Sequence, residues 1–162
     1  MSQFVSIPTT LMSSEQLFPY LPHRPPMVWI NGILSVSDTG GECLVKLAPN
    51  AHYFDHNQRI RKSVCIEWMA QGYGFISAYK DYQKISLAKG MQSDSNVEAY
   101  LAAVKNLRFY DFERLNSIDV RYLIVQVNLL RSIPPLHLVE GKILSANKIY
   151  ATAELKLYAK EG

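Results

Sequence analysis

A single carboxylic acid in apolar surroundings is the residue of this sequence best suited to proton transfer. Glu67 stands between Ile66 and Trp68, in a run whose apolar residues form two rows at helical spacing. Burial disfavours a charged carboxylate, so a glutamic acid on such a helix is able to hold and deliver a proton. The alternative is a core carboxylate with structural partners. We take Glu67 as the candidate acid.

Two histidines, His52 and His56, lie in the polar segment that precedes this helix. A neutral imidazole accepts a proton near neutral pH, so each is a candidate base. The alternative is that both are solvated loop residues without a catalytic role. His23, which is flanked by prolines, is expected to order the entry to the first strand. His137 has no evident partner in the sequence.

Anion-binding groups are predicted between these histidines and the helix. Arg59, Arg61 and Lys62 form a basic cluster that is suited to a phosphate or an acidic partner, although a solvated loop explains it equally well. The first N–H groups of the helix, at Ser63 and Val64, add hydrogen-bond donors at the positive end of the helix dipole. These groups are candidates for substrate binding.

The composition argues against several other classes of protein. Cys43 and Cys65 form no zinc-type group with the histidines, and Cys65 is expected to be a small buried hydrophobe, so we predict no metal and a reducing, cytoplasmic environment. The formal charge of +3 is too small to indicate nucleic acid. We find no signal peptide in residues 1–12 and no apolar run long enough to cross a membrane.

The elements that position these groups follow from periodicity. A long buried helix is predicted over Ser63 to Tyr82, in which Gly72 and Gly74 indicate close approach of another backbone, while Tyr73 is expected to pack. A capping box at Ser13 to Gln16 predicts a short helix that ends by Pro22.

Strands are predicted on both sides of the long helix. They cover residues 27–36 and 42–48 as a hairpin, then 97–109, 118–130, 136–144 and 149–158. In the run 97–109, one face carries Val97, Ala99, Leu101 and Ala103. In the run 149–158, one face carries Ile149, Ala151, Ala153, Leu155 and Leu157. Because no helix separates the later strands, we predict a single α+β domain over residues 1–162, with an antiparallel sheet wrapped around one central helix.

Three segments resemble the 3-hydroxyacyl-acyl-carrier-protein dehydratase family. They are Pro22 to Met27 (PHRPPM), Ile66 to Gln71 (IEWMAQ) and Tyr100 to Phe109 (YLAAVKNLRF). The family shares these motifs in the same order, and the likeness is greatest to the divergent dehydratase-like proteins of aryl polyene biosynthesis. The resemblance implies a hot-dog fold, usually dimeric. The family's loop pattern Phe-Phe-x-Gly-His-Phe-Pro is altered here to Tyr53-Phe54-Asp55-His56-Asn57-Gln58.

The resemblance also implies an activity, namely dehydration of 3-hydroxyacyl-carrier-protein thioesters to trans-2-enoyl thioesters. Glu67 is then the acid and His56 or His52 the base, supplied by opposite subunits. The amides at Ser63 and Val64 would polarise the thioester carbonyl, and the basic cluster would dock the acidic acyl carrier protein. The phosphopantetheine arm of the carrier brings the substrate, and elimination of water needs no metal or redox cofactor.

Two alternatives stay open at this point. The altered loop favours a non-catalytic hot-dog subunit that completes a heterodimer with an active dehydratase. A thioesterase of the same fold would use Glu67 to activate water. The sequence leaves homodimer and heterodimer open.

Overall fold

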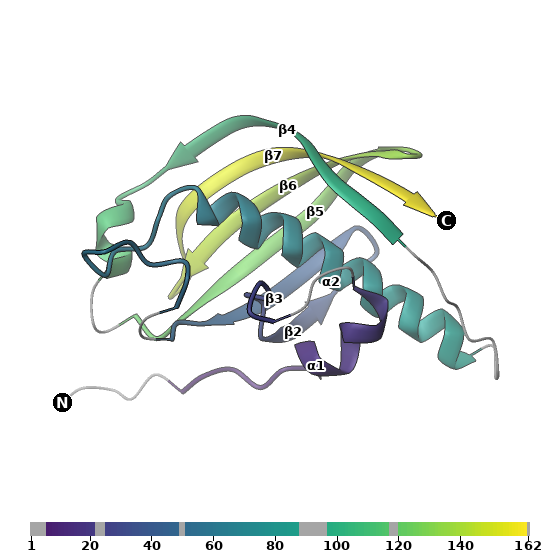
Figure 1. Cartoon of the computed structure of the whole chain (residues 1–162), viewed down its shortest axis with the longest axis horizontal. Coiled ribbons are helices and arrows are strands. Elements are labelled where there is room, and N and C mark those ends of the chain that lie inside the picture. The colour runs from purple at the N-terminus through teal and green to yellow at the C-terminus, as the bar shows by residue number, and fades with distance from the viewer. Residues whose placement is uncertain (1–5, 22–24, 49–50, 88–96, 117–119, 162) are drawn as a thin grey trace.

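A strongly curled antiparallel sheet surrounds one long helix in the computed structural model (Figure 1). The structure describes residues 6–21, 25–48, 51–87, 97–116 and 120–161. Its seven strands follow the order β1-β2-β3-β5-β6-β7-β4, and the helix α2 (Val64–Leu87) lies along the concave face. The predicted α+β architecture is confirmed.

The remaining elements flank this helix in the chain. Before it come β1 (Met12–Ser13), α1 (Ser14–Leu17), η1 (Phe18–Tyr20), β2 (Gly32–Val36) and β3 (Gly40–Lys46). After it come β4 (Val97–Phe109), η2 (Phe112–Asn116), β5 (Tyr122–Ile133), β6 (Leu136–Ser145) and β7 (Lys148–Glu161). The predicted start of the strand over residues 118–130, at Ile118, lies outside the described residues.

The short N-terminal helix forms as predicted. The backbone N–H of Ser13 donates to Oε1 of Gln16 at 3.1 Å, which is one half of the capping box. Helix α1 ends at Leu17, and the single turn η1 ends at Tyr20, before Pro22. His23 lies outside the described residues.

Helix α2 is longer than predicted, since it begins at Val64 and continues to Leu87. Its glycines differ from each other. A Cβ on Gly72 would lie 3.0 Å from Cγ1 of Val125 on β5, so the packing is close there, but a side chain and not the predicted backbone makes the contact. A Cβ on Gly74 would have no heavy atom within 4 Å, so the same prediction is wrong for Gly74. A side chain of α2 also lies against a glycine of the sheet, since a Cβ on Gly141 would lie 2.5 Å from Cγ of Met69.

The first long strand starts later than predicted, at Gly32 instead of Met27. The backbone carbonyl of Met27 and the N–H of Trp29 are both bonded to the side chain of Gln71. Because a helix side chain satisfies these groups, the segment runs beside α2 without joining the sheet.

The last strand reverses the predicted facing of two residues. Ala151, Ala153, Leu155 and Leu157 are buried as predicted, whereas Ile149 is exposed and Tyr150 is buried. The pairing of β6 with β7 shifts register between Ile143 and Leu144. Such a shift turns the following residues to the other face of the sheet.

Strand β4 is exposed along much of its length, although its alternating pattern places apolar residues on one face. It is the last strand in the sheet order and pairs with β7. Ala99 is exposed, as are Tyr100 (58%), Leu101 (43%) and Leu107 (37%). The side chain of Val97 lies outside the described residues. A long apolar edge strand of this kind is a surface for pairing with another chain.

Candidate active site

The carboxyl group of Glu67 is held by the side chain of Gln71, one helical turn further along α2. Nε2 of Gln71 donates to Oε1 of Glu67 at 2.8 Å and to the carbonyl of Met27 at 2.7 Å. Oε1 of Gln71 accepts the N–H of Trp29 at 2.9 Å. Gln71 is only 2% exposed, whereas Glu67 is half-buried. A fully bonded amide therefore fixes the orientation of the candidate acid.

A cavity of about 290 Å³ is bordered by this carboxyl group. Helix α2 forms one wall, strands β4 and β7 form the other, and η1 closes one side. Its lining comprises Tyr20, Leu21, Glu67, Ala70, Gln71, Tyr73, Gly74, Ser77, Ala78, Asp81, Ala99, Tyr100, Leu101, Leu157 and Ala159. A mostly apolar cleft with a few polar groups at fixed positions is the usual form of a small-molecule site.

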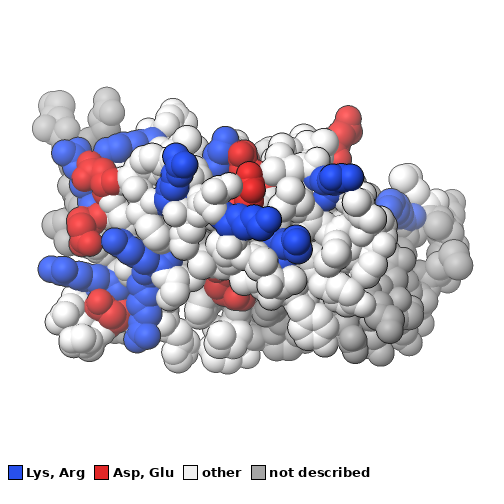
Figure 2. Space-filling view, turned by 90° about the horizontal axis from the view of Figure 1, so that it is seen from above, with Lys and Arg blue, Asp and Glu red and all other residues white. Residues whose placement is uncertain are grey.

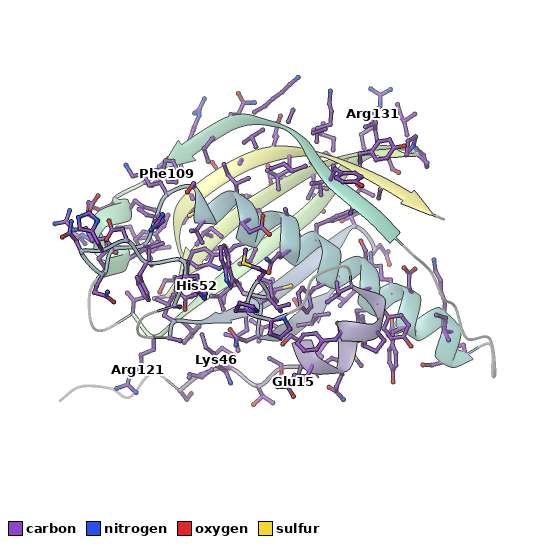
Figure 3. The ribbon with its side chains drawn as sticks, in the orientation of Figure 1. Glu15, Lys46, His52, Phe109, Arg121 and Arg131 are labelled. Carbon is purple, nitrogen blue, oxygen red and sulfur yellow. The ribbon has the colours of Figure 1, made fainter. Side chains whose placement is uncertain are left out.

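The two candidate histidines do not border this cavity within their own chain. His52 and His56 are both exposed in the loop before α2. In Figure 3 the labelled His52 lies below the start of α2, away from Phe109 at the end of β4 above it. The structure therefore does not bring either histidine to Glu67 of the same subunit.

Tyr53 anchors this loop. Its ring is buried and lies 6.0 Å from the ring of Trp29 and 5.3 Å from that of Trp68, between centroids. Its hydroxyl accepts the N–H of Ala48 at 2.7 Å, and burial raises the pKa of the Tyr53 phenol. The loop is thus fixed from within, while His52 and His56 stay in solvent.

One of the two predicted amide donors, that of Val64, is engaged at the start of the helix, as is the amide of Cys65 next to it. The N–H of Val64 donates to the carbonyl of Arg61 at 3.0 Å, and that of Cys65 donates to the carbonyl of Lys62 at 3.2 Å. Ser63 is exposed and lies in the turn just before the helix. A thioester carbonyl would have to compete with these bonds for the amide of Val64.

The basic cluster is exposed on the loop and turn before α2, and each of its side chains contacts the protein. Arg59 lies 4.0 Å from the carboxylate of Glu113, Nε of Arg61 donates to the carbonyl of Phe54 at 3.4 Å, and Nζ of Lys62 lies 5.3 Å above the ring of Phe109. Figure 2 shows Lys and Arg side chains interspersed with Asp and Glu on the face seen from above. Such exposed contacts contribute little to stability.

Both cysteines are buried, and their thiols are protonated and therefore weak nucleophiles. Burial raises the pKa of Cys65 to about 12 and raises that of Cys43, so both thiols stay protonated at neutral pH. Within the described residues no group of three or more metal-ligating side chains occurs, and no helix is long and apolar enough to cross a membrane.

His137 has partners that the sequence did not reveal. Its Nδ1 lies 2.9 Å from Oγ of Ser132, and its ring lies 6.2 Å from that of Tyr73, between centroids. Tyr73, which was expected only to pack, also borders the cavity. The role of Gln71 was missed, although a glutamine in an otherwise apolar helical row was a usable signal because such a buried amide requires partners.

A profile of the ApeP-like family, described as ApeP dehydratase, matches residues 15–105. The chain belongs to the ApeP-like dehydratase family. This match covers more than half of the chain, including α2 with Glu67 and Gln71, and it confirms the resemblance to the dehydratase-like proteins of aryl polyene biosynthesis. No curated protein sequence matches the chain significantly.

Solved structures confirm the hot-dog fold. The dehydratase heterocomplex ApeI:P from Xenorhabdus doucetiae gives a TM-score of 0.72 at 23% identity, covering 89% of this chain and 90% of the matched chain. A thioesterase family protein from Silicibacter pomeroyi gives 0.59 at 9% identity, with 86% and 91% covered. A putative thioesterase from Shewanella oneidensis gives 0.52 at 15% identity, with 83% and 84% covered. Dehydratases and thioesterases thus share this architecture.

Proposed function

We propose that this protein dehydrates 3-hydroxyacyl groups carried on an acyl carrier protein, within a dimer formed with a second hot-dog chain. The observation that carries this proposal is the carboxyl group of Glu67, fixed by Gln71 in the wall of an otherwise mostly apolar cavity. Family membership supports the same reaction class. The expected setting is cytoplasmic lipid synthesis of the fatty-acid or aryl polyene type.

The reaction needs one acid and one base. A histidine takes the α proton of the thioester, the C–H electron pair forms the new double bond, and the C–O bond to the 3-hydroxyl breaks as Glu67 protonates the leaving oxygen. Water and a trans-2-enoyl thioester result. His52 and His56 lie outside the cavity of their own chain. In this scheme the histidine that works with Glu67 therefore belongs to the other subunit.

The exposed edge of β4 is the proposed contact with that subunit. Tyr100 and Leu101 border both this edge and the cavity, so a chain paired along β4 would also close the cavity. The matched structure from Xenorhabdus doucetiae is a dehydratase heterocomplex, which supports a different hot-dog chain as the partner.

The carrier protein would dock beside the start of α2. Arg59, Arg61 and Lys62 are exposed there and would steer an acidic carrier and the phosphate of its phosphopantetheine arm. Dehydration leaves the oxidation state balanced, so the proposal includes no metal or redox cofactor.

A non-catalytic role in the heterodimer is the second candidate. The observation that favours it is the pairing of the Val64 and Cys65 amides within the chain, which weakens the proposed oxyanion contact. In that case the partner chain would supply the complete site, and Glu67 would serve only the packing of α2.

The test follows the mass of a 3-hydroxyacyl-carrier protein that is incubated with the purified protein, alone and with the hot-dog chain that co-purifies with it. We expect loss of one water molecule with the complex, abolished by Glu67→Gln and retained by Glu15→Gln, an exposed glutamate on α1. Water loss that is unaffected by Glu67→Gln would establish the non-catalytic role. Release of the free acid would indicate a thioesterase.

A further inference from the structure

Gly74 lies in the middle of α2 without a packing reason inside its own chain. Glycine is a poor helix former, and it is tolerated inside helices mainly where a neighbour leaves no room for a side chain. Gly72 meets that condition because Val125 lies against it. A Cβ on Gly74 would have no heavy atom within 4 Å. The space beside Gly74 is therefore open.

That open space belongs to the cavity that Glu67 borders. Gly74 lies two helical turns after Glu67 on the same face of α2, a rise of about 10 Å along the axis. Ala70 precedes it on this face and Ala78 follows it, and the larger side chains of Gln71 and Tyr73 also line this wall. The opposite wall carries Leu101 and Leu157.

We propose that Gly74 determines the length and bulk of the acyl chain that the cavity accepts. The inference rests on the proposed function, because the occupant is the apolar tail of a thioester whose reacting carbons lie at Glu67. A tail that starts at Glu67 and follows α2 passes Ala70 and the side chains of Gln71 and Tyr73, and then reaches the open space at position 74. With glycine there, the tail continues past that position toward Ser77 and Ala78.

A side chain at position 74 would project into this path. Gly74→Val places a branched side chain about 10 Å from Glu67, which leaves the near part of the cavity unchanged. Short acyl chains are then accommodated as before, and long ones collide with the valine. Gly74→Ala adds only a methyl group, so it is expected to fold and to give a smaller effect in the same direction.

The experiment measures binding independently of catalysis. The complex with the hot-dog partner is titrated calorimetrically with acyl-pantetheine amides of increasing chain length, which cannot be dehydrated because they lack the 3-hydroxyl. We expect affinity to rise with length in the unchanged protein. Gly74→Val should weaken the long ligands by roughly tenfold or more and leave the short ones unaffected. The control Ser86→Val adds the same side chain to an exposed position of α2 outside the cavity, and it should change neither.

Two results would overturn the assignment. One is binding that depends on chain length equally in the unchanged protein, Gly74→Ala and Gly74→Val. The other is loss of the hot-dog partner by both Gly74 variants, with the length dependence of binding intact, which would place the glycine in a subunit contact. If binding behaves as expected while no variant dehydrates a 3-hydroxyacyl-carrier protein, the role of Gly74 stands and the proposed reaction fails.

Discussion

Gln71 connects three parts of the molecule through one amide group. It bonds the carboxyl group of Glu67, the carbonyl of Met27 and the N–H of Trp29, so it joins the candidate acid to the segment that leads into β2. If the amide were rotated, its NH2 group and its oxygen would exchange places, and the hydrogen bonds of both would be lost. The geometry of the candidate acid therefore depends on the docking of a segment far away in the sequence.

Replacing this residue tests that coupling. Gln71→Leu fills similar space but leaves the backbone groups of Met27 and Trp29 without their partner, so we expect a loss of about 2 kcal/mol in the free energy of unfolding. Urea denaturation followed by circular dichroism measures the change. Gln83→Leu, which removes an amide that donates only to Tyr79 at the surface of the same helix, should stay within about 0.5 kcal/mol. Equal losses in both variants would contradict the role of Gln71.

At the residue scale, the sequence marks a candidate acid more clearly than a candidate base, and both roles stay predictions. Glu67 is recognisable because a carboxyl group in an apolar helical run is rare and costly without a purpose. The histidines offered no such signal, since exposed loop residues with and without a role have the same composition. In the proposed dimer, the histidine that works with Glu67 belongs to another chain. The sequence of this chain carries no information about that residue.

Replacing either of two glycines of α2, Gly72 or Gly74, by alanine is expected to affect stability differently. Gly74→Ala should raise the free energy of unfolding by about 0.5–1 kcal/mol, because its Cβ has room and alanine is the better helix former. Gly72→Ala should not raise the free energy of unfolding, because its Cβ would press on Cγ1 of Val125 at 3.0 Å in the core. Thermal unfolding of both variants measures the difference, for which we expect about 1–2 kcal/mol. The interpretation fails if Gly72→Ala is the more stable of the two.

The elements themselves were predictable to different degrees. The start of α2 and the paired strands β5 to β7 follow from periodicity, which reports burial directly. The late start of β2 depends on hydrogen bonds from Gln71, and the exchange of Ile149 and Tyr150 depends on a register shift opposite Leu144. Both are long-range effects that leave no local pattern.

At the scale of the whole molecule, β4 shows what an alternating pattern leaves undecided. A strand that pairs with a second chain alternates in the same way as one that is buried in its own core, so the sequence cannot tell the two apart. The exposed apolar side chains of β4 are those of an edge strand, along which a partner chain would extend the sheet.

Charge on this edge should interfere with assembly. Leu107→Asp places a carboxylate on β4, and we expect it to weaken association with the hot-dog partner by about tenfold, a change of about 1.4 kcal/mol. Sedimentation velocity over a range of concentrations measures the dissociation constant. The control Leu87→Asp adds the same charge at the 86% exposed end of α2 and should leave association unchanged. Identical behaviour of the two variants would exclude β4 as the contact.

The packing around Tyr53 gives the molecule a built-in optical reporter. The chain has two tryptophans, and both Trp29 and Trp68 lie against the ring of Tyr53, which anchors the loop with His52 and His56. Any motion that lifts this loop from α2 changes the surroundings of both indoles at once. Native fluorescence therefore reports loop docking in real time, without a label, while a carrier protein or a second subunit arrives.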